Sequence, residues 1–220
     1  MNKRTLKRHR SMGYFIEAAA QIMDEEGMEA LTIRKVADLA GYNSATLYNY
    51  FKNLDELILY ASIKHLKDYT SNLAKYTASA KNNVEKYLKI WERFCRYSFA
   101  NPQVYNMIFF SKHTVSVPHI VKEYYAIFPE ELGEHSEDVI PMLLESNLYL
   151  RNLVFLSRIQ ADGDITEEDM NTLNEMTILL YYGMLTKTIN SEDGYSVDEV
   201  TEKTVAYVTH LLYSFMTDKP

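Results

Sequence analysis

The chain has 220 residues, of which 47% are hydrophobic, and a formal net charge of −7. This length fits one large domain, or a small domain joined to a larger one, with enough apolar residues for a real core. The single cysteine, Cys95, excludes an intrachain disulfide and is typical of a reducing compartment. The N-terminus lacks the apolar core of a signal peptide, and no apolar run reaches membrane-spanning length, so we expect a soluble cytoplasmic protein.

The charge is distributed unevenly along the chain. Residues 1–52 carry eight basic and six acidic side chains, a net charge of +2, whereas the remaining residues carry 15 and 24, a net charge of −9. Five basic residues and no acidic one lie within residues 1–10. A basic N-terminal part on an otherwise acidic chain favours nucleic-acid binding by residues 1–52. The basic residues at the N-terminus can also be an ordinary solubilising segment.

Only 7 glycines and 5 prolines occur, and apolar residues recur at helical spacing, which predicts an all-α fold. Residues 1–10 are expected to form a loose arm that becomes helical near its end, with Ser11 as the N-cap of the first helix. Gly27 is expected to end that helix. Its buried face is predicted to contain Ile16, Ala19, Ala20 and Met23.

Residues 32–52 predict two short helices around a sharp turn. Thr32 can cap the first of them, Gly41 allows the left-handed turn, and Asn43 can cap a second helix over residues 44–50. Leu47 is its expected buried anchor. This is the layout of a helix-turn-helix, in which the second helix enters a DNA major groove.

Asn53, followed by Glu56, predicts a capping box at the start of a long helix that continues to about Tyr76. Thr166 and Ser196 are expected to cap the last two helices. After the long helix, the expected helices cover residues 82–100, 102–111, 118–128 and 138–161, and the last two cover residues 167–190 and 197–216.

Two segments carry a family resemblance: L-T-I-R-K-V-A-D-L-A-G and S-A-T-L-Y-N-Y-F-K-N-L-D-E-L. With the residues before them, from Ile16 to Leu57, they resemble the N-terminal domain of the TetR family of bacterial transcriptional regulators. The resemblance implies a helix-turn-helix DNA-binding domain over residues 1–52, and a helical effector-binding and dimerisation domain over residues 53–220. It also implies a homodimer, joined by the last two helices of each subunit, that acts as a ligand-responsive repressor on a palindromic double-stranded DNA operator.

The apolar stripes of the last two helices agree with that implied dimer. They contain Leu173, Leu180, Tyr181, Met184, Val205, Val208 and Leu212.

The resemblance also assigns residues to the DNA. It places at the bases Arg34, Ser44, Ala45, Thr46 and Tyr48. It places near the phosphates Thr32, Asn49, Tyr50 and Lys52. Arginine can bind guanine through two hydrogen bonds, methyl groups can contact thymine, and hydroxyl or lysine groups can hold phosphates.

Three points stay open at this stage. Leu54 stands where the family usually has a lysine, which questions a phosphate contact there. Tyr48 and Tyr50 could instead be core aromatic residues. The chain could also be a helical dimeric interaction protein that has lost specific DNA binding.

The chain contains 18 Tyr, 9 Phe and one Trp, many of them between Tyr87 and Phe155. Plain core packing explains any one of them, but as a group they favour a pocket for an aromatic or hydrophobic small-molecule effector. Polar groups such as Arg96 could orient the effector, whereas Glu92 or Glu145 could favour a cation. The candidate ligand-binding residues are Trp91, Cys95, Tyr105, Phe109, Asn147 and Arg151.

Other chemistry is not supported by the sequence. The six histidines show no metal-ligand spacing with one another or with Cys95. Neither a glycine-rich phosphate loop nor a G-x-S-x-G motif occurs. We therefore expect no metal, no cofactor and no enzymatic activity.

Overall fold

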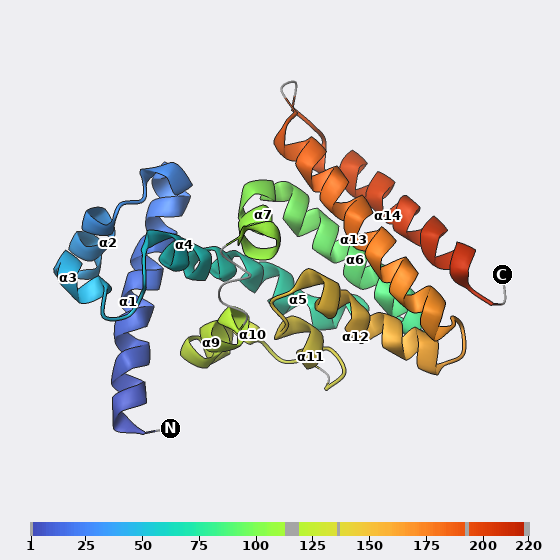
Figure 1. Ribbon diagram of the computed structural model, residues 1–220, viewed down its shortest axis with the longest axis horizontal. Helices are drawn as coiled ribbons and strands as arrows, with labels where there is room; N and C mark the ends of the chain where they lie inside the picture. The colour runs from blue at the N-terminus through green and yellow to red at the C-terminus, as the bar shows by residue number, and fades with distance from the viewer. Residues whose placement is uncertain (1, 113–118, 136, 192–193, 218–220) are drawn as a thin grey trace.

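The computed structural model describes residues 2–112, 119–135, 137–191 and 194–217. The fold is all-α, as predicted, and these residues contain no strand. Figure 1 shows a small N-terminal unit on the left, a larger helical body on the right, and α4 reaching from one into the other.

The N-terminal unit contains α1 (Lys3–Glu26), α2 (Ile33–Ala40) and α3 (Ser44–Leu47). Its core includes Phe15, Ile16, Val36 and Leu47, none of which is measurably exposed.

The prediction for the start of α1 was wrong. The helix begins at Lys3, because the side chain of Asn2 accepts a hydrogen bond from the backbone N–H of Thr5 at 2.8 Å. Ser11 is a buried residue inside the helix and caps nothing. The basic residues at the N-terminus are therefore held on a helix rather than on a loose arm.

The linking helix α4 (Leu54–Ile63) begins directly after its cap, Asn53. A 3₁₀ segment, Lys64–Leu66, follows it, and α5 (Lys67–Thr77) continues the path, so the predicted long helix is one helical stretch with a tighter turn inside it. Every residue from Leu57 to Ile63 is buried. A helix buried on all sides must be packed by neighbours all round, and α4 contacts α1, α7 and α9.

In the described part of the body, helices of varied length lie between α5 and the last two helices. Their bounds are Asn83–Ala100 for α6, Pro102–Phe110 for α7, Ile120–Ile127 for α9, Pro129–Leu132 for α10, Ile140–Leu143 for α11 and Leu148–Ala161 for α12. The helix predicted over residues 138–161 is thus interrupted at residues 144–147.

Two side chains hold that interruption. Asn147 caps α12 by accepting a hydrogen bond from the backbone N–H of Leu150 at 3.2 Å. Arg151 donates to the carbonyl oxygens of Leu143 and Glu145, at 3.3 and 3.4 Å, and so binds carbonyl groups near the end of α11.

The last two helices, α13 (Glu167–Ile189) and α14 (Val197–Phe215), lie side by side at the end of the body remote from α1 to α3 (Figure 1). Their predicted caps, Thr166 and Ser196, are confirmed by hydrogen bonds to the backbone N–H groups three residues on. Along the described parts of the chain, no helix combines the length and apolar character needed to cross a membrane.

Candidate functional site

The turn between α2 and α3 has the predicted local chemistry. Gly41 adopts the left-handed conformation at φ 77° and ψ 27°, which favours glycine because other residues suffer a Cβ clash there. Asn43 accepts hydrogen bonds from both the backbone N–H and the hydroxyl of Thr46, each at 2.9 Å. Leu47 is fully buried and fixes one face of α3 against the core, so the opposite face points to solvent.

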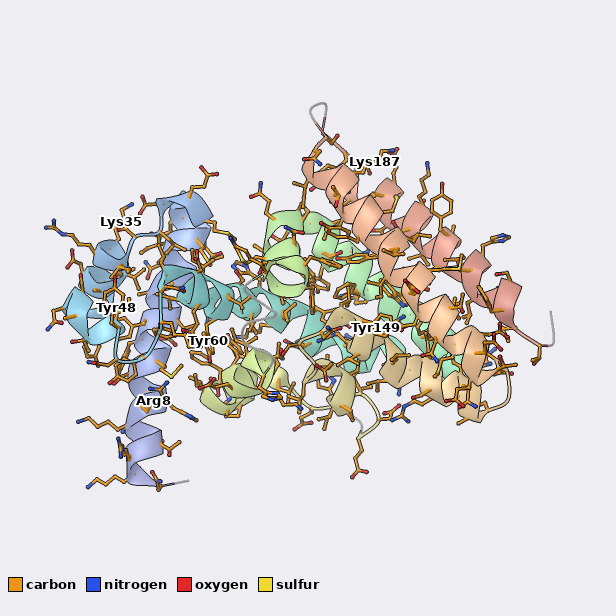
Figure 2. The ribbon with its side chains drawn as sticks, in the orientation of Figure 1. Arg8, Lys35, Tyr48, Tyr60, Tyr149 and Lys187 are labelled. Carbon is orange, nitrogen blue, oxygen red and sulfur yellow. The ribbon has the colours of Figure 1, made fainter. Side chains whose placement is uncertain are left out.

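All nine residues proposed to contact DNA lie at the surface of this unit. Six of them are exposed: Thr32, Arg34, Ala45, Tyr48, Asn49 and Lys52. Ser44, Thr46 and Tyr50 are half-buried. The structure therefore brings the set together over α2, α3 and the residues that follow α3, and Figure 2 shows Tyr48 at the outer edge of the unit, away from the body.

The two tyrosines of this segment differ in their surroundings. Tyr48 is 57% exposed, so it is not a core aromatic residue. The ring of Tyr50 packs against Phe15, with 5.9 Å between ring centroids, and the guanidinium carbon of Arg8 lies 5.7 Å from the Tyr50 ring centroid. Tyr50 thus packs on the core and has a cation over its ring.

Arg8 connects the basic segment to the helix-turn-helix. Its guanidinium donates to the carbonyl oxygens of Asn49 and Tyr50, at 3.3 and 3.4 Å. A groove runs beside this contact, lined by Arg4, Thr5, Lys7, Arg8, Asn49 and Tyr50. The excess of basic residues in the sequence indicated an anion-binding arm, but it could not have indicated which arginine meets the end of the helix-turn-helix.

Leu54, the departure from the family pattern, is half-buried and packs against the core at the start of α4. The backbone N–H groups at the start of α4 find hydrogen-bond acceptors without a lysine. Asn53 accepts from the backbone N–H of Glu56 at 2.9 Å, and the Glu56 carboxylate accepts from the backbone N–H of Lys52 at 2.6 Å. The cap at Asn53 is thus the one that the sequence predicts, but the capping box differs by one residue, because Glu56 accepts from Lys52, which precedes the cap, and not from Asn53 itself.

A small cavity of about 30 Å³, lined mostly by buried side chains, lies in the body between α5, α6, α11 and α12. Of the six candidate ligand-binding residues, Trp91 and Arg151 line it. Cys95, Tyr105 and Phe109 are buried nearby, and Phe94, which lines the cavity, packs against the last two of these at 5.5 Å between ring centroids. Asn147 is exposed and caps α12, so it lies apart from the cavity.

The other cavity-lining residues were not among the six candidates, although Tyr87, Phe94 and Phe155 belong to the aromatic group from which the sequence predicts a pocket. Asn152 belongs to a buried chain of amides: Trp91 Nε1 donates to Asn152 Oδ1 at 3.0 Å, and Asn152 Nδ2 donates to Asn174 Oδ1 at 2.8 Å. Asn152 directly follows Arg151 on α12, and nothing in this part of the sequence indicates a buried chain of amides. The remaining lining residues are Tyr69, Tyr87, Ile90, Phe94, Met142, Leu148 and Phe155.

Arg151 is the charged side chain in this lining, and it is only 2% exposed. Its guanidinium carbon lies 5.7 Å from the Tyr69 ring centroid and 5.5 Å from that of Phe109. Among the described residues, none forms an ion pair with it. Contacts with two aromatic faces stabilise a cation by about 0.5–2 kcal/mol each, whereas removing an ion from water costs several kcal/mol, so the charge is only partly compensated.

Several buried tyrosine hydroxyls surround this region. Burial raises the pKa of Tyr87 to about 12, and burial likewise raises the pKa of Tyr125 to about 12, with Arg151 acting in the opposite direction on Tyr125. The hydroxyl groups of Tyr87, Tyr105 and Tyr125 have no hydrogen-bond partner among the described residues. The surroundings of Arg151 are therefore neutral and rich in hydrogen-bond donors near neutral pH.

Within the described residues, no cluster of histidine, cysteine or carboxylate side chains is suited to holding a metal ion. Burial strongly raises the pKa of the Cys95 thiol, which keeps it protonated and unreactive.

Comparisons with known proteins bear on the surface formed by α2 and α3. Residues 15–61 match the family model described as bacterial regulatory proteins, tetR family. Over 70 residues the chain is 33% identical to the HTH-type transcriptional repressor KstR2 of Mycobacterium tuberculosis, a match that covers 27% of this chain and 35% of that protein. The chain thus spans less than half the length of the curated relatives that it matches.

Solved structures resemble the chain over nearly its whole length. The TetR-family transcriptional repressor FadR of Thermus thermophilus, in complex with lauroyl-CoA, is similar with a TM-score of 0.61 at 13% identity, covering 95% of this chain and 97% of that one. The structure of RolR in complex with resorcinol gives a TM-score of 0.59 at 14% identity, covering 97% and 98%. At these identities the likeness establishes a common fold.

Proposed function

We propose that this chain, which belongs to the TetR family of bacterial regulatory proteins, is a homodimeric transcriptional repressor whose binding to a DNA operator is controlled by a small molecule. The observation that carries the proposal is the solvent-facing surface of α2 and α3. It presents the nine proposed DNA-contacting residues together, with α3 anchored by Leu47 behind it.

The proposed division of labour follows from exposure and chemistry. Arg34 and Tyr48 are exposed and are assigned to the base edges, together with Ser44, Ala45 and Thr46. Thr32, Asn49, Tyr50 and Lys52 flank them and are assigned to phosphates, which fix the register without specifying sequence. The proposed domains, residues 1–52 and 53–220, meet at the start of α4.

A homodimer is supported by the outer face of α13. Met176 and Leu179 are large apolar residues that are at least 42% exposed on this one helix, although α13 packs on α12 and α14 along its inner face. Tyr182 is also 42% exposed, and its ring packs on Phe110 of α7. Exposed apolar residues gathered on one helix face are typical of an interface. Two such subunits would present two α3 helices to half-sites about 34–36 Å apart, or a multiple of that distance.

Control by a small molecule is supported by the aromatic cavity and by α4. FadR and RolR, which share the fold, have been solved with lauroyl-CoA and resorcinol. In this chain α4 contacts α1 on one side and α7 and α9 on the other. A ligand that favours one arrangement of the body would therefore shift the position of α1 to α3, which is a population shift.

DNA binding is tested by electrophoretic mobility shift with the DNA upstream of the chain's own gene. We expect a specific complex that Arg34→Ala and Tyr48→Ala weaken, by about 5- to 150-fold where a bidentate base contact is removed. Arg96→Ala is the control, because Arg96 pairs with Asp198 on the body. Weak binding that is blind to sequence would instead favour a helical dimeric interaction protein without specific DNA recognition.

A further inference from the structure

The buried guanidinium of Arg151 points to the chemical class of the effector. We propose that the cavity between α5, α6, α11 and α12 binds a small molecule with one carboxylate and an apolar body, and that Arg151 holds the carboxylate. This inference rests on the proposed function in one respect only, namely that the body of the protein binds an effector.

The first argument is that Arg151 has hydrogen-bonding capacity to spare. Nη1 donates to two carbonyl oxygens, of Leu143 and Glu145, but Nη2 has no hydrogen-bond partner among the described residues although it is buried. The guanidinium offers five N–H donors in a planar fork that matches a carboxylate. The side chain is thus positioned by Nη1, while Nη2 can donate to a ligand.

The second argument is the sign of the charge. Arg151 contacts the backbone of Glu145, but the Glu145 carboxylate accepts from the backbone N–H groups of Ser146 and Asn147, at 3.0 and 3.3 Å. Three tyrosines interact electrostatically with Arg151, namely Tyr69, Tyr105 and Tyr125. They are neutral, since burial raises the pKa values of their hydroxyl groups. A cationic ligand would meet a positive charge that is only partly compensated, whereas an anion would neutralise it.

The third argument concerns the other polar groups of the lining. Both amide atoms of Asn152 are already used, by Trp91 and by Asn174. The Tyr87 hydroxyl has no partner in the described part of the chain, and it can donate to an oxygen atom. The unused polar groups of the described lining are thus the Arg151 Nη2, which can only donate, and the Tyr87 hydroxyl, which can donate. Both suit a ligand group that accepts hydrogen bonds.

The rest of the lining selects an apolar body. Ile90, Phe94, Leu148 and Phe155 contribute only hydrocarbon surface. A volume of about 30 Å³ accommodates one or two water-sized groups, so a larger ligand must displace side chains of the lining. Because Arg151 also holds the interruption between α11 and α12, a carboxylate bound to it would act directly on the joint between these helices.

The sole tryptophan provides a direct measurement. Trp91 lines the cavity, so its fluorescence reports ligand entry without any DNA. The full-length protein is titrated with two matched pairs: 3-phenylpropionate against 3-phenylpropanamide, and decanoate against decan-1-ol. We expect saturable quenching or a spectral shift with at least one acid. Its neutral counterpart should bind roughly 10- to 100-fold more weakly, because an amide or alcohol oxygen carries no charge and cannot form the bidentate ionic hydrogen bonds of a carboxylate with the guanidinium.

The variant Arg151→Met should remove the preference for the acid while keeping most of the apolar volume. Arg158→Met, on the same helix, is the matched control and should keep that preference. Arg151→Lys retains the charge without the fork and should give intermediate affinity. Circular dichroism confirms that each variant is folded, and if Arg151→Met does not fold, Arg151→Lys takes its place in the comparison.

The proposal is overturned if neither acid binds, if the neutral counterpart binds equally well, or if Arg151→Met keeps the preference. None of these outcomes depends on DNA. Failure of specific operator binding with intact acid binding would count against the proposed function alone, and the reverse result would count against the effector class alone.

Discussion

The hydroxyl group of Tyr60, on α4, donates a 2.5 Å hydrogen bond to the Glu123 carboxylate on α9. Tyr60 is 2% exposed, and both its burial and the nearby carboxylate raise the pKa of its hydroxyl. Close by, Lys64 donates to Glu131 at 2.9 Å, and Tyr124 donates to the same carboxylate at 2.5 Å. The linking helix is therefore bonded to the body by specific polar contacts as well as by apolar packing.

Tyr60→Phe should destabilise the protein. The change leaves the half-buried Glu123 carboxylate without its donor, and a hydrogen bond to a charged group contributes roughly 1.5–3 kcal/mol. The free energy of unfolding in urea should fall by about this amount. Tyr14→Phe, which removes an exposed hydroxyl on α1, is the control, and an equal effect in the two variants would mean that the Tyr60 contact contributes nothing of its own.

The basic groove at the start of α1 should contribute to DNA affinity through phosphate contacts. Because Arg4 and Lys7 lie on an ordered helix beside Asn49, their replacement by alanine together should weaken binding to all sequences. A plot of log K against log salt has a negative slope, and its magnitude should decrease by up to about 0.9 for each phosphate that the variant no longer neutralises. Lys187→Ala, on α13 of the body and away from α1 (Figure 2), should leave the slope unchanged. A double variant with an unaltered slope would place the groove away from DNA.

Leu179→Glu should convert the proposed dimer to a monomer. Leu179 is 62% exposed on α13, and two carboxylates brought together in an apolar interface would be desolvated without partners. Light scattering at micromolar concentration measures the change. Leu39→Glu, which changes an exposed residue on α2, is the control, and its measured mass should remain that of a dimer. A wild-type protein that is already monomeric would contradict the proposed assembly.

Alkaline solution should unfold the protein cooperatively between about pH 10 and 12. The pKa of the Tyr87 and Tyr125 hydroxyls is raised from 10.0 to about 12, so the folded state binds these protons more tightly than the unfolded chain. The resulting stability is complete below pH 10 and is lost as the pH rises towards 12. Tyrosinate absorbance and helical circular dichroism, recorded together, should change together.

Tyr87→Phe should make the loss of stability with pH less steep, because one such group is removed. If the buried tyrosines ionised in a chain that kept its full helical signal, the coupling of their burial to folding would be refuted.

Local chemistry made much of the N-terminal unit predictable. Thr32, Asn43 and Asn53 cap helices through hydrogen bonds that depend only on residues three positions away, and Gly41 satisfies a backbone requirement of its own. The start of α1 was mispredicted because Asn2 and Ser11 both suit a cap, and only tertiary burial of Ser11 decides between them.

The cavity was less predictable because it depends on long-range packing. Apolar spacing continues from α11 into α12, so the sequence predicted one helix where the side chain of Arg151 stabilises a break. Asn147 and Asn152 are the same residue type, yet one caps a helix at the surface while the other bonds Trp91 in the core. Distinguishing them requires knowledge of which helices face one another.

The burial of α4 on all sides has a consequence for exchanging parts between relatives. The family match extends to residue 61, well past Lys52, and Leu57–Ile63 packs inside both the N-terminal unit and the body. A chimaera joined at residue 52 would place a foreign α1 against a native α4 and create mismatched volumes in a close-packed core. The 3₁₀ segment Lys64–Leu66 is a better junction, provided that the α4 residues facing α7 and α9 are kept as they are in this chain.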